Sequence, residues 1–165
     1  MTSEHLLHTI PPIYDGNSKI LILGSFPSVK SREVSFYYGH PQNRFWRVLA
    51  AVLGCAVPSS NEEKTALLQS HNIALWDVIK SCDILGSSDS SIKNVVPNDI
   101  GAILSSCGIR QIYSNGKTSE KLFNKYIKDT VGRDTVALPS TSPANASYNL
   151  ERLTDSWSVI KNNIR

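Results

Sequence analysis

The chain has 165 residues, of which 41% are hydrophobic and 19% charged, and its formal net charge at pH 7 is +3. This composition predicts one globular domain over residues 1–165 with a core of its own, and it excludes disordered and fibrous chains. No apolar run is long enough to span a bilayer, and the first residues lack a signal-peptide pattern. We therefore expect a cytoplasmic, intracellular protein with no membrane partner.

The three cysteines, Cys55, Cys82 and Cys107, stand far apart and form no CxxC pair. They cannot supply the four thiolates of a structural zinc or iron–sulfur site, so we expect no metal site. We interpret them as small buried side chains. The weak positive charge permits an anionic partner without requiring one.

Four short segments rich in apolar and β-branched residues predict β-strands. The first, KILILG at 19–24, is almost wholly apolar, as expected of a strand covered on both faces. The other three are NIALWDV at 72–78, RQIYS at 110–114 and TVALPS at 135–140.

Segments with helical spacing of apolar residues fill the intervals between these strands and follow the last one. Ser60 and Glu63 form a capping-box pair at the start of one helix, and Asn98 and Gly108 are expected to cap and end another. The expected helices cover residues 45–53, 59–70, 99–108, 122–127 and 150–160.

Alternation of strands and helices predicts an α/β fold, a three-layer α/β/α sandwich around a central four-stranded parallel sheet. Ligands of such sheets bind beyond the carboxyl ends of the strands. The loops after Gly24, Asp77 and Leu138 are therefore expected to lie together.

Two of these loops carry small polar groups. GSFPS at 24–28 can offer backbone N–H groups to an anion or a carbonyl. LPSTSPANA at 138–146 is either a capped turn or a stiff loop that approaches a phosphate backbone, since hydroxyls and amides bond phosphate oxygens without bulk.

A third segment, FYYGHPQNRFW at 36–46, combines aromatic rings, an amide and a cation. Together with the two loops it resembles the uracil-DNA glycosylase superfamily, and within it the hypoxanthine-DNA (deoxyinosine) glycosylase branch. GSFPS stands where the first motif of the superfamily stands, and FYYGHPQNRFW is similar to the HPxNRFW element of the branch. LPSTSPANA resembles the final motif, and LWDVIKSCDILGSSDSSIKN at 75–94 also looks like the branch.

The resemblance extends from about residue 20 to about residue 146 and implies a uracil-DNA glycosylase-like fold. It implies an enzyme that initiates base excision repair. We expect this enzyme to be a monofunctional hydrolase, because no lysine lies in the GHPQNRFW or LPSTSPANA segments, and to act as a monomer without a cofactor. Such an enzyme flips a deaminated base out of double-stranded DNA and hydrolyses its glycosidic bond, with hypoxanthine as the expected base. The alternatives are a uracil or mismatched-thymine glycosylase, and a non-catalytic DNA- or nucleotide-binding module.

The resemblance also implies a catalytic role for Asn43. Many superfamily members keep an Asp or Asn just before the proline of the first motif to position the attacking water, and here Phe26 stands there. In the branch that this chain resembles, the asparagine of HPQN takes the role, which gives it to Asn43. Its side-chain oxygen is expected to hold the water, although Asn43 also suits the N-cap of the helix that follows.

Base binding is expected from the first motif, from an aromatic ring and from a carboxylate. Gly24, Ser25 and Phe26 would offer backbone N–H groups to a base carbonyl, and Tyr38 would stack on the flipped base. Asp77 either accepts a hydrogen bond from a base N–H or caps a turn.

DNA contacts are expected mainly from the final loop. Its three hydroxyl residues would touch phosphates, and its Pro and Ala would press into the space that the base leaves. These residues are Ser140, Thr141, Ser142, Pro143 and Ala144. Arg44 reaches a phosphate or pairs with a carboxylate, His40 is interpreted as structural, and Asn115–Gly116 as a turn.

Overall fold

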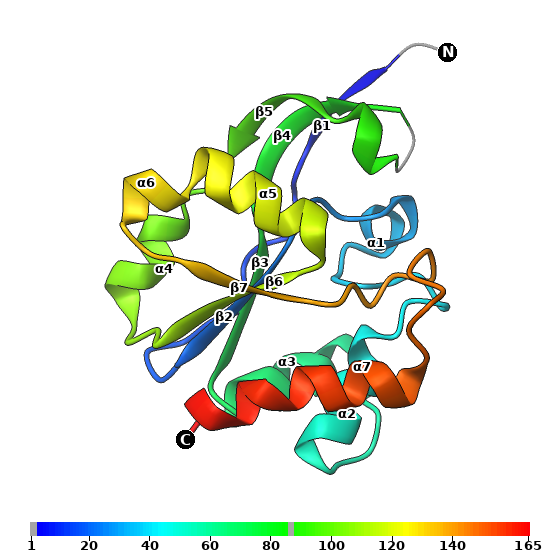
Figure 1. The fold of residues 1–165 in the computed structure, drawn as a ribbon, viewed down its shortest axis with the longest axis vertical. Coiled ribbons are helices and arrows are strands. Elements are labelled where there is room, and N and C mark those ends of the chain that lie inside the picture. Colours follow the sequence, from blue (N-terminus) through cyan, green and yellow to red (C-terminus); the bar gives the residue numbers. More distant parts are fainter. Residues whose placement is uncertain (1–2, 86–87) are drawn as a thin grey trace.

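The computed structural model describes residues 3–85 and 88–165. At its centre lies a four-stranded parallel sheet in the order β3-β2-β6-β7 (Figure 1). The strands are β2 (Ile20–Gly24), β3 (Ile73–Asp77), β6 (Gln111–Asn115) and β7 (Thr135–Leu138). The four predicted strands are therefore confirmed, each with its bounds shifted by no more than a residue or two.

Helices cover both faces of this sheet, because successive side chains of a strand point to opposite sides. Ile20 and Ile22 pack against one layer of helices, and Leu21 and Leu23 pack against the other. The first layer contains α2 (Phe45–Leu53), α3 (Asn61–Ser70) and α7 (Leu150–Trp157). The second contains α4 (Ile100–Ser106), α5 (Lys117–Tyr126) and α6 (Lys128–Val131), and Figure 1 shows the two layers apart. The predicted three-layer α/β/α sandwich is confirmed.

A second, antiparallel sheet in the order β1-β4-β5 was not predicted. Its strands are β1 (Glu4–Leu7), β4 (Ile79–Ile84) and β5 (Lys93–Pro97). It uses much of the segment 75–94 that resembles the glycosylase branch, of which residues 86 and 87 lie outside the described part of the chain. The segment mixes polar and apolar residues too irregularly to suggest strands.

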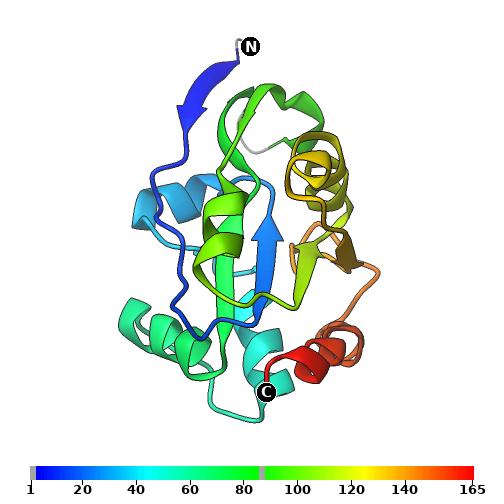
Figure 2. The ribbon, with the colours of Figure 1, turned by 90° about the vertical axis from the view of Figure 1, so that its left-hand side faces the viewer.

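The N-terminal segment crosses from this small sheet to the large one. His8, directly after β1, donates its backbone N–H to the Lys80 carbonyl oxygen at 2.7 Å. Ile13 then forms an antiparallel bridge with Leu75 of β3. Figure 2 shows this segment running along the sheet before it turns back into β2. The small sheet thereby anchors His8 near the carboxyl end of β3.

Helix ends follow the predicted chemistry only in part. Ser60 caps α3 by accepting from Glu63 N, and the Glu63 carboxylate accepts from the backbone N–H and the hydroxyl of Ser59. Asp99, not Asn98, caps α4, and the helix ends at a Cys107 cap before Gly108. Asn98 is diverted because its amide donates to the carbonyl oxygens of residues 77 and 79.

The shorter helical segments are α1 (Val29–Val34) and the 3-10 turns η1 (Asp89–Ser91) and η2 (Ser158–Asn163). Ser28 starts α1 by accepting from Ser31 N. The cysteine prediction is wrong for Cys55, which is exposed, and only Cys82 is fully buried. No helix in the described part of the chain has the length and apolarity to cross a membrane.

Candidate active site

The expected loops meet at the carboxyl edge of the parallel sheet. Along the chain, β3 joins one side of β2 and β6 joins the other, so the strand order reverses between β2 and β6. That point is where open α/β sheets bind ligands. Gly24 at the end of β2 is in register with Asp77, and Asn115 at the end of β6 is in register with Leu138.

Gly24 allows a side chain of β3 and an aromatic ring to approach the first loop closely. A Cβ at this position would lie 2.3 Å from Asp77 Oδ1 and 3.1 Å from the Tyr38 hydroxyl oxygen. The carbonyl oxygens of Gly24 and Ser25 accept from Val78 N and Ile79 N at 2.9 and 3.1 Å. The loop is therefore tied to β3 and β4, and a residue larger than glycine would displace the carboxylate.

Asp77 forms a buried pair with His8, a residue that the sequence did not suggest. His8 Nε2 lies 2.7 Å from Asp77 Oδ2, and the two side chains are 1% and 5% exposed. The Phe26 ring meets the His8 ring edge to face at 6.0 Å, so Phe26 presents an apolar surface there. The pair fixes the direction of the carboxylate, whose other oxygen faces Gly24.

Tyr38 is held in an unusual backbone conformation with φ 53°, which is rare for a bulky residue and marks a position held by its surroundings. Its ring stacks on Phe45 with 4.1 Å between centroids. Its hydroxyl is buried and makes no hydrogen bond with the described residues. Burial raises the pKa of this hydroxyl, Asp77 raises it further, and the nearby Asn115 amide lowers it slightly. The hydroxyl therefore stays protonated as a donor.

Asn43 lies just before α2, and its side-chain oxygen accepts two hydrogen bonds. Phe45 N and the Thr141 hydroxyl each donate to Asn43 Oδ1 at 2.9 Å. The N-cap position itself is occupied by Arg44, which makes no side-chain cap bond. Asn43 therefore satisfies one free N–H at the helix start, as the capping interpretation expects, and also reaches the final loop.

Thr141 is fully buried, which revises the phosphate contact expected of it. Its hydroxyl accepts from Asn115 Nδ2 at 3.0 Å and donates to Asn43, so it is not free to meet DNA. Asn115 also accepts from Thr141 N at 3.1 Å. The residue interpreted as part of a simple turn thus joins the end of β6 to the final loop. No local sequence pattern indicates this contact.

The final loop is held by Arg44. Its guanidinium donates to the backbone carbonyl oxygens of Ser142, at 2.9 Å, of Asn145, at 3.2 Å, and of Tyr148. The expected partners were a phosphate or a carboxylate, and the structure instead assigns this side chain to shaping the loop. His40 precedes it as expected of a structural residue, because its Nδ1 accepts from Gln42 N.

Arg44→Gln should therefore loosen the final loop without removing a phosphate contact. We expect the free energy of unfolding to fall by about 1–3 kcal/mol, as for lost hydrogen bonds from a charged donor. The slope of log affinity for duplex DNA against log salt should not change. A slope reduced by about 1 would indicate a direct phosphate contact instead. Arg47→Gln, at an exposed arginine in α2, is the matched control for loss of one charge.

The remaining loop residues stay accessible at its tip. Pro143 and Ala144 are exposed, and Ser140 and Ser142 are partly exposed. Both serines form tight turns, since Ser140 Oγ accepts from Ser142 N and Ser142 Oγ accepts from Ala144 N. Trp157 Nε1 of α7 donates to the Pro139 carbonyl oxygen at 2.9 Å. The tip is thus presented on a braced loop.

Comparison with known proteins agrees with this arrangement. The family model described as the uracil DNA glycosylase superfamily matches residues 11–162. The chain therefore belongs to the uracil DNA glycosylase superfamily.

Two curated relatives of this chain are both named hypoxanthine DNA glycosylase. The protein of Methanosarcina barkeri is 36% identical over 137 residues, which cover 82% of this chain and 85% of the relative. The protein of Methanosarcina acetivorans is 34% identical over 152 residues, which cover 91% of this chain and 94% of the relative. An NMR structure from M. acetivorans, assigned provisionally as a uracil DNA glycosylase, has a TM-score of 0.79 and 33% identity, and covers 92% of this chain and 94% of that one.

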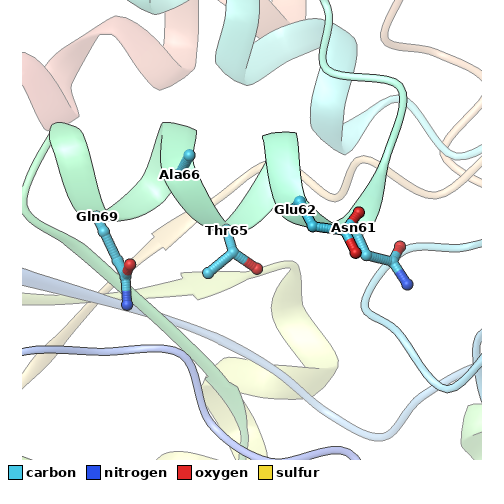
Figure 3. Close-up of a pocket in the computed structure, with 5 residues that line it drawn as sticks. All are labelled: Asn61, Glu62, Thr65, Ala66 and Gln69. Carbon is cyan, nitrogen blue, oxygen red and sulfur yellow. The ribbon is translucent and has the colours of Figure 1, made fainter.

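A hollow on the surface of α3 lies outside the superfamily motifs. Figure 3 shows its lining residues, which all come from this one helix: Asn61, Glu62, Thr65, Ala66 and Gln69. It brings together no groups from different elements and none from the carboxyl edge of the sheet. The candidate site is therefore the cluster around Gly24, Tyr38, Asn43 and Asp77.

Proposed function

We propose that this protein is a DNA glycosylase that removes hypoxanthine from deoxyinosine in double-stranded DNA and acts as a monomer. The observation that carries the proposal is the pair of relatives named hypoxanthine DNA glycosylase, which match most of the chain at 34–36% identity. The motif residues of this branch lie together at the carboxyl edge of the sheet, which supports it.

The base would be held between the first loop and β3. A flipped base loses its stacking in the duplex, and an aromatic face restores about 1–3 kcal/mol per base. Tyr38 is braced from one side by Phe45, which supports its use as that face. Asp77, fixed by His8, would accept a hydrogen bond from a base N–H, and backbone N–H groups of Ser25 and Phe26 would meet a base carbonyl.

Asn43 would hold the attacking water, but through a different atom from the one the sequence suggested. An amide oxygen has two lone pairs, and both already accept bonds from Phe45 N and Thr141. The hydrogen bonds of the Asn43 side chain within the described part of the chain run through Oδ1, and the residue is partly exposed, so Nδ2 is the atom left for a water. Asn43 Nδ2 would donate a hydrogen bond to one lone pair of the water oxygen. The second lone pair of that oxygen would face the anomeric carbon of the sugar.

Bond cleavage would then rest on position and electrostatics rather than on a strong base. An amide has no useful pKa, so Asn43 would not take a proton in the rate-limiting step. A sugar with oxocarbenium character needs only a weak nucleophile, provided that it is correctly placed. The C–N bond breaks with its electron pair going to the base, the water oxygen bonds the anomeric carbon, and the proton that the water loses ends on the departing base. The loop tip at Pro143 and Ala144 would occupy the space that the base leaves, with Ser140 and Ser142 near the phosphates.

Release of free base from defined duplexes tests the proposal. Duplexes containing inosine, uracil, a G·T mismatch or only normal pairs are incubated with excess enzyme, and abasic sites are scored as strand breaks after alkali. We expect the fastest release from inosine and none from the normal duplex. Fastest release from uracil or from the mismatch would favour the alternative glycosylases of the same superfamily. Binding without release from any duplex would indicate a non-catalytic module.

The same reactions, treated with borohydride, test whether the enzyme only hydrolyses. A glycosylase that also nicks DNA usually forms a Schiff base through an amine. No lysine lies in the GHPQNRFW or LPSTSPANA segments. We therefore expect no covalent protein–DNA adduct and no strand break before alkali. A trapped adduct would contradict a purely hydrolytic mechanism.

A further inference from the structure

We infer that Asn115, acting through Thr141, is a positioning residue that, together with Phe45 N, holds the Asn43 amide with its NH2 end toward the substrate. The inference rests on the proposed function, because it concerns the same reacting centre. Asn115 comes from the end of β6, Thr141 from the final loop and Asn43 from the segment before α2. Their hydrogen bonds form one series across three segments of the fold, in which Asn115 donates to Thr141 and Thr141 donates to Asn43.

The series of hydrogen bonds starts at the Asn115 amide, whose orientation is fixed by its partners. A backbone N–H can only donate, and Thr141 N lies 3.1 Å from Asn115 Oδ1, which must therefore be the oxygen. The other end of the amide is the NH2 group, and it lies 3.0 Å from Thr141 Oγ1. Because the Asn115 NH2 can only donate, the Thr141 hydroxyl oxygen accepts there and keeps its own proton for another partner.

That partner is Asn43. Thr141 Oγ1 lies 2.9 Å from Asn43 Oδ1, and the hydroxyl proton has an acceptor in this direction. Phe45 N donates to the same oxygen at 2.9 Å. Two donors therefore converge on one end of the Asn43 amide, which must be its oxygen, and the NH2 end is turned away from the protein interior. A flipped amide would place an NH2 group against two donors.

The position of these hydrogen bonds in the fold favours a role beyond anchoring the final loop. Thr141 is 0% exposed, so solvent does not compete for its hydroxyl. Asn115 stands beside the point where the strand order reverses, and its amide lies near the Tyr38 hydroxyl, whose pKa it lowers. A loop anchor would need only the contact between Asn115 and the Thr141 backbone. The hydroxyl step ties the loop to Asn43 as well, and it adds a second donor beside Phe45 N at Asn43 Oδ1, which reinforces the orientation of this amide.

Asn115→Asp keeps the size of the side chain and tests the direction of this series of hydrogen bonds. The carboxylate can still accept from Thr141 N, but its second oxygen cannot donate. It would draw the Thr141 proton away from Asn43 and leave two oxygens facing each other. We expect the single-turnover rate of base release from an inosine duplex to fall about 10- to 100-fold, in line with misplacement of a reacting group. Affinity for a duplex with a non-cleavable inosine analogue should stay within about threefold of wild type.

Two changes at Thr141 complete the test and guard against a variant that does not fold. Thr141→Ser keeps the hydroxyl and should retain the wild-type rate, whereas Thr141→Val removes it and should lower the rate as Asn115→Asp does. In the Thr141→Val background, Asn115→Asp should have no further effect on the rate, since both changes interrupt the same series of hydrogen bonds.

Three results would overturn the inference: a wild-type rate in Thr141→Val, additive losses in the double variant, or equal losses in Thr141→Ser and Thr141→Val. Failure of the wild-type protein to release any base would instead overturn the proposed function, and this inference with it.

Discussion

Asn43→Ala is expected to lower the single-turnover rate of hypoxanthine release about 100-fold or more, as for the loss of one preorganised polar group at a reacting centre. The change removes the NH2 group that we propose holds the attacking water. It also leaves Phe45 N–H and the Thr141 hydroxyl without their acceptor, so we expect the free energy of unfolding to fall by about 1–3 kcal/mol. Rate and melting temperature are measured on the same preparation.

Asn43→Ser separates catalysis from capping. A serine hydroxyl can accept from a backbone N–H two residues on, so it should recover part of the lost stability. It carries no NH2 group and should not recover the rate. If rate and stability return together in Asn43→Ser, the role of Asn43 is that of a cap alone.

Asp77→Ala is expected to have the second large effect. It leaves the buried His8 ring without its partner and opens a space beside Gly24, which should cost about 1–3 kcal/mol of stability. It also removes the proposed acceptor for a base N–H. We expect base release to slow about tenfold or more, since each hydrogen bond to a charged acceptor is worth about 1.5–3 kcal/mol.

The ratio of inosine to uracil release distinguishes a base-reading role from a structural one. His8→Gln keeps a donor for the carboxylate and serves as the matched control, and it should preserve the ratio. Asp77→Ala should change the ratio, because the two bases present their N–H groups in different places. An unchanged ratio with both rates reduced equally would show that Asp77 only supports the loop.

The central sheet could be predicted because its strands are continuous apolar runs covered on both faces. Ile20–Gly24 and Ile73–Asp77 have this form, and parallel strands then bring Gly24 and Asp77 to one edge. The motif segments were recognisable from the sequence because their characteristic residues are neighbours along the chain. Rings, an amide and an arginine stand side by side in residues 36–46.

Contacts between distant segments could not be predicted in this way. His8 follows a short exposed strand, and only the pairing of β1 with β4 brings it to Asp77. Asn115 looks like half of a turn, and its partner Thr141 lies on another loop. An irregular loop has no side-chain period, so nothing in LPSTSPANA indicates that Thr141 points inward.

Arg44 shows a further limit of reading side chains by type. An arginine beside a DNA-binding motif suggests phosphate, but a guanidinium also has five donors that match a cluster of carbonyl oxygens. The final loop turns three carbonyl oxygens toward α2, and Arg44 meets them. That cluster exists only once the loop is folded.

Asn43→Asp gives the most direct test of the proposed chemistry. The carboxylate can accept from Phe45 N and Thr141 as the amide oxygen does, so the fold around it should persist. The NH2 group is lost, and a carboxylate oxygen that carries negative charge takes its place. We measure single-turnover release of hypoxanthine from an inosine duplex, together with melting temperature. We expect a stable protein whose rate is reduced as strongly as that of Asn43→Ala. A stable Asn43→Asp protein with wild-type or faster release would contradict the donor role and assign the water to the oxygen.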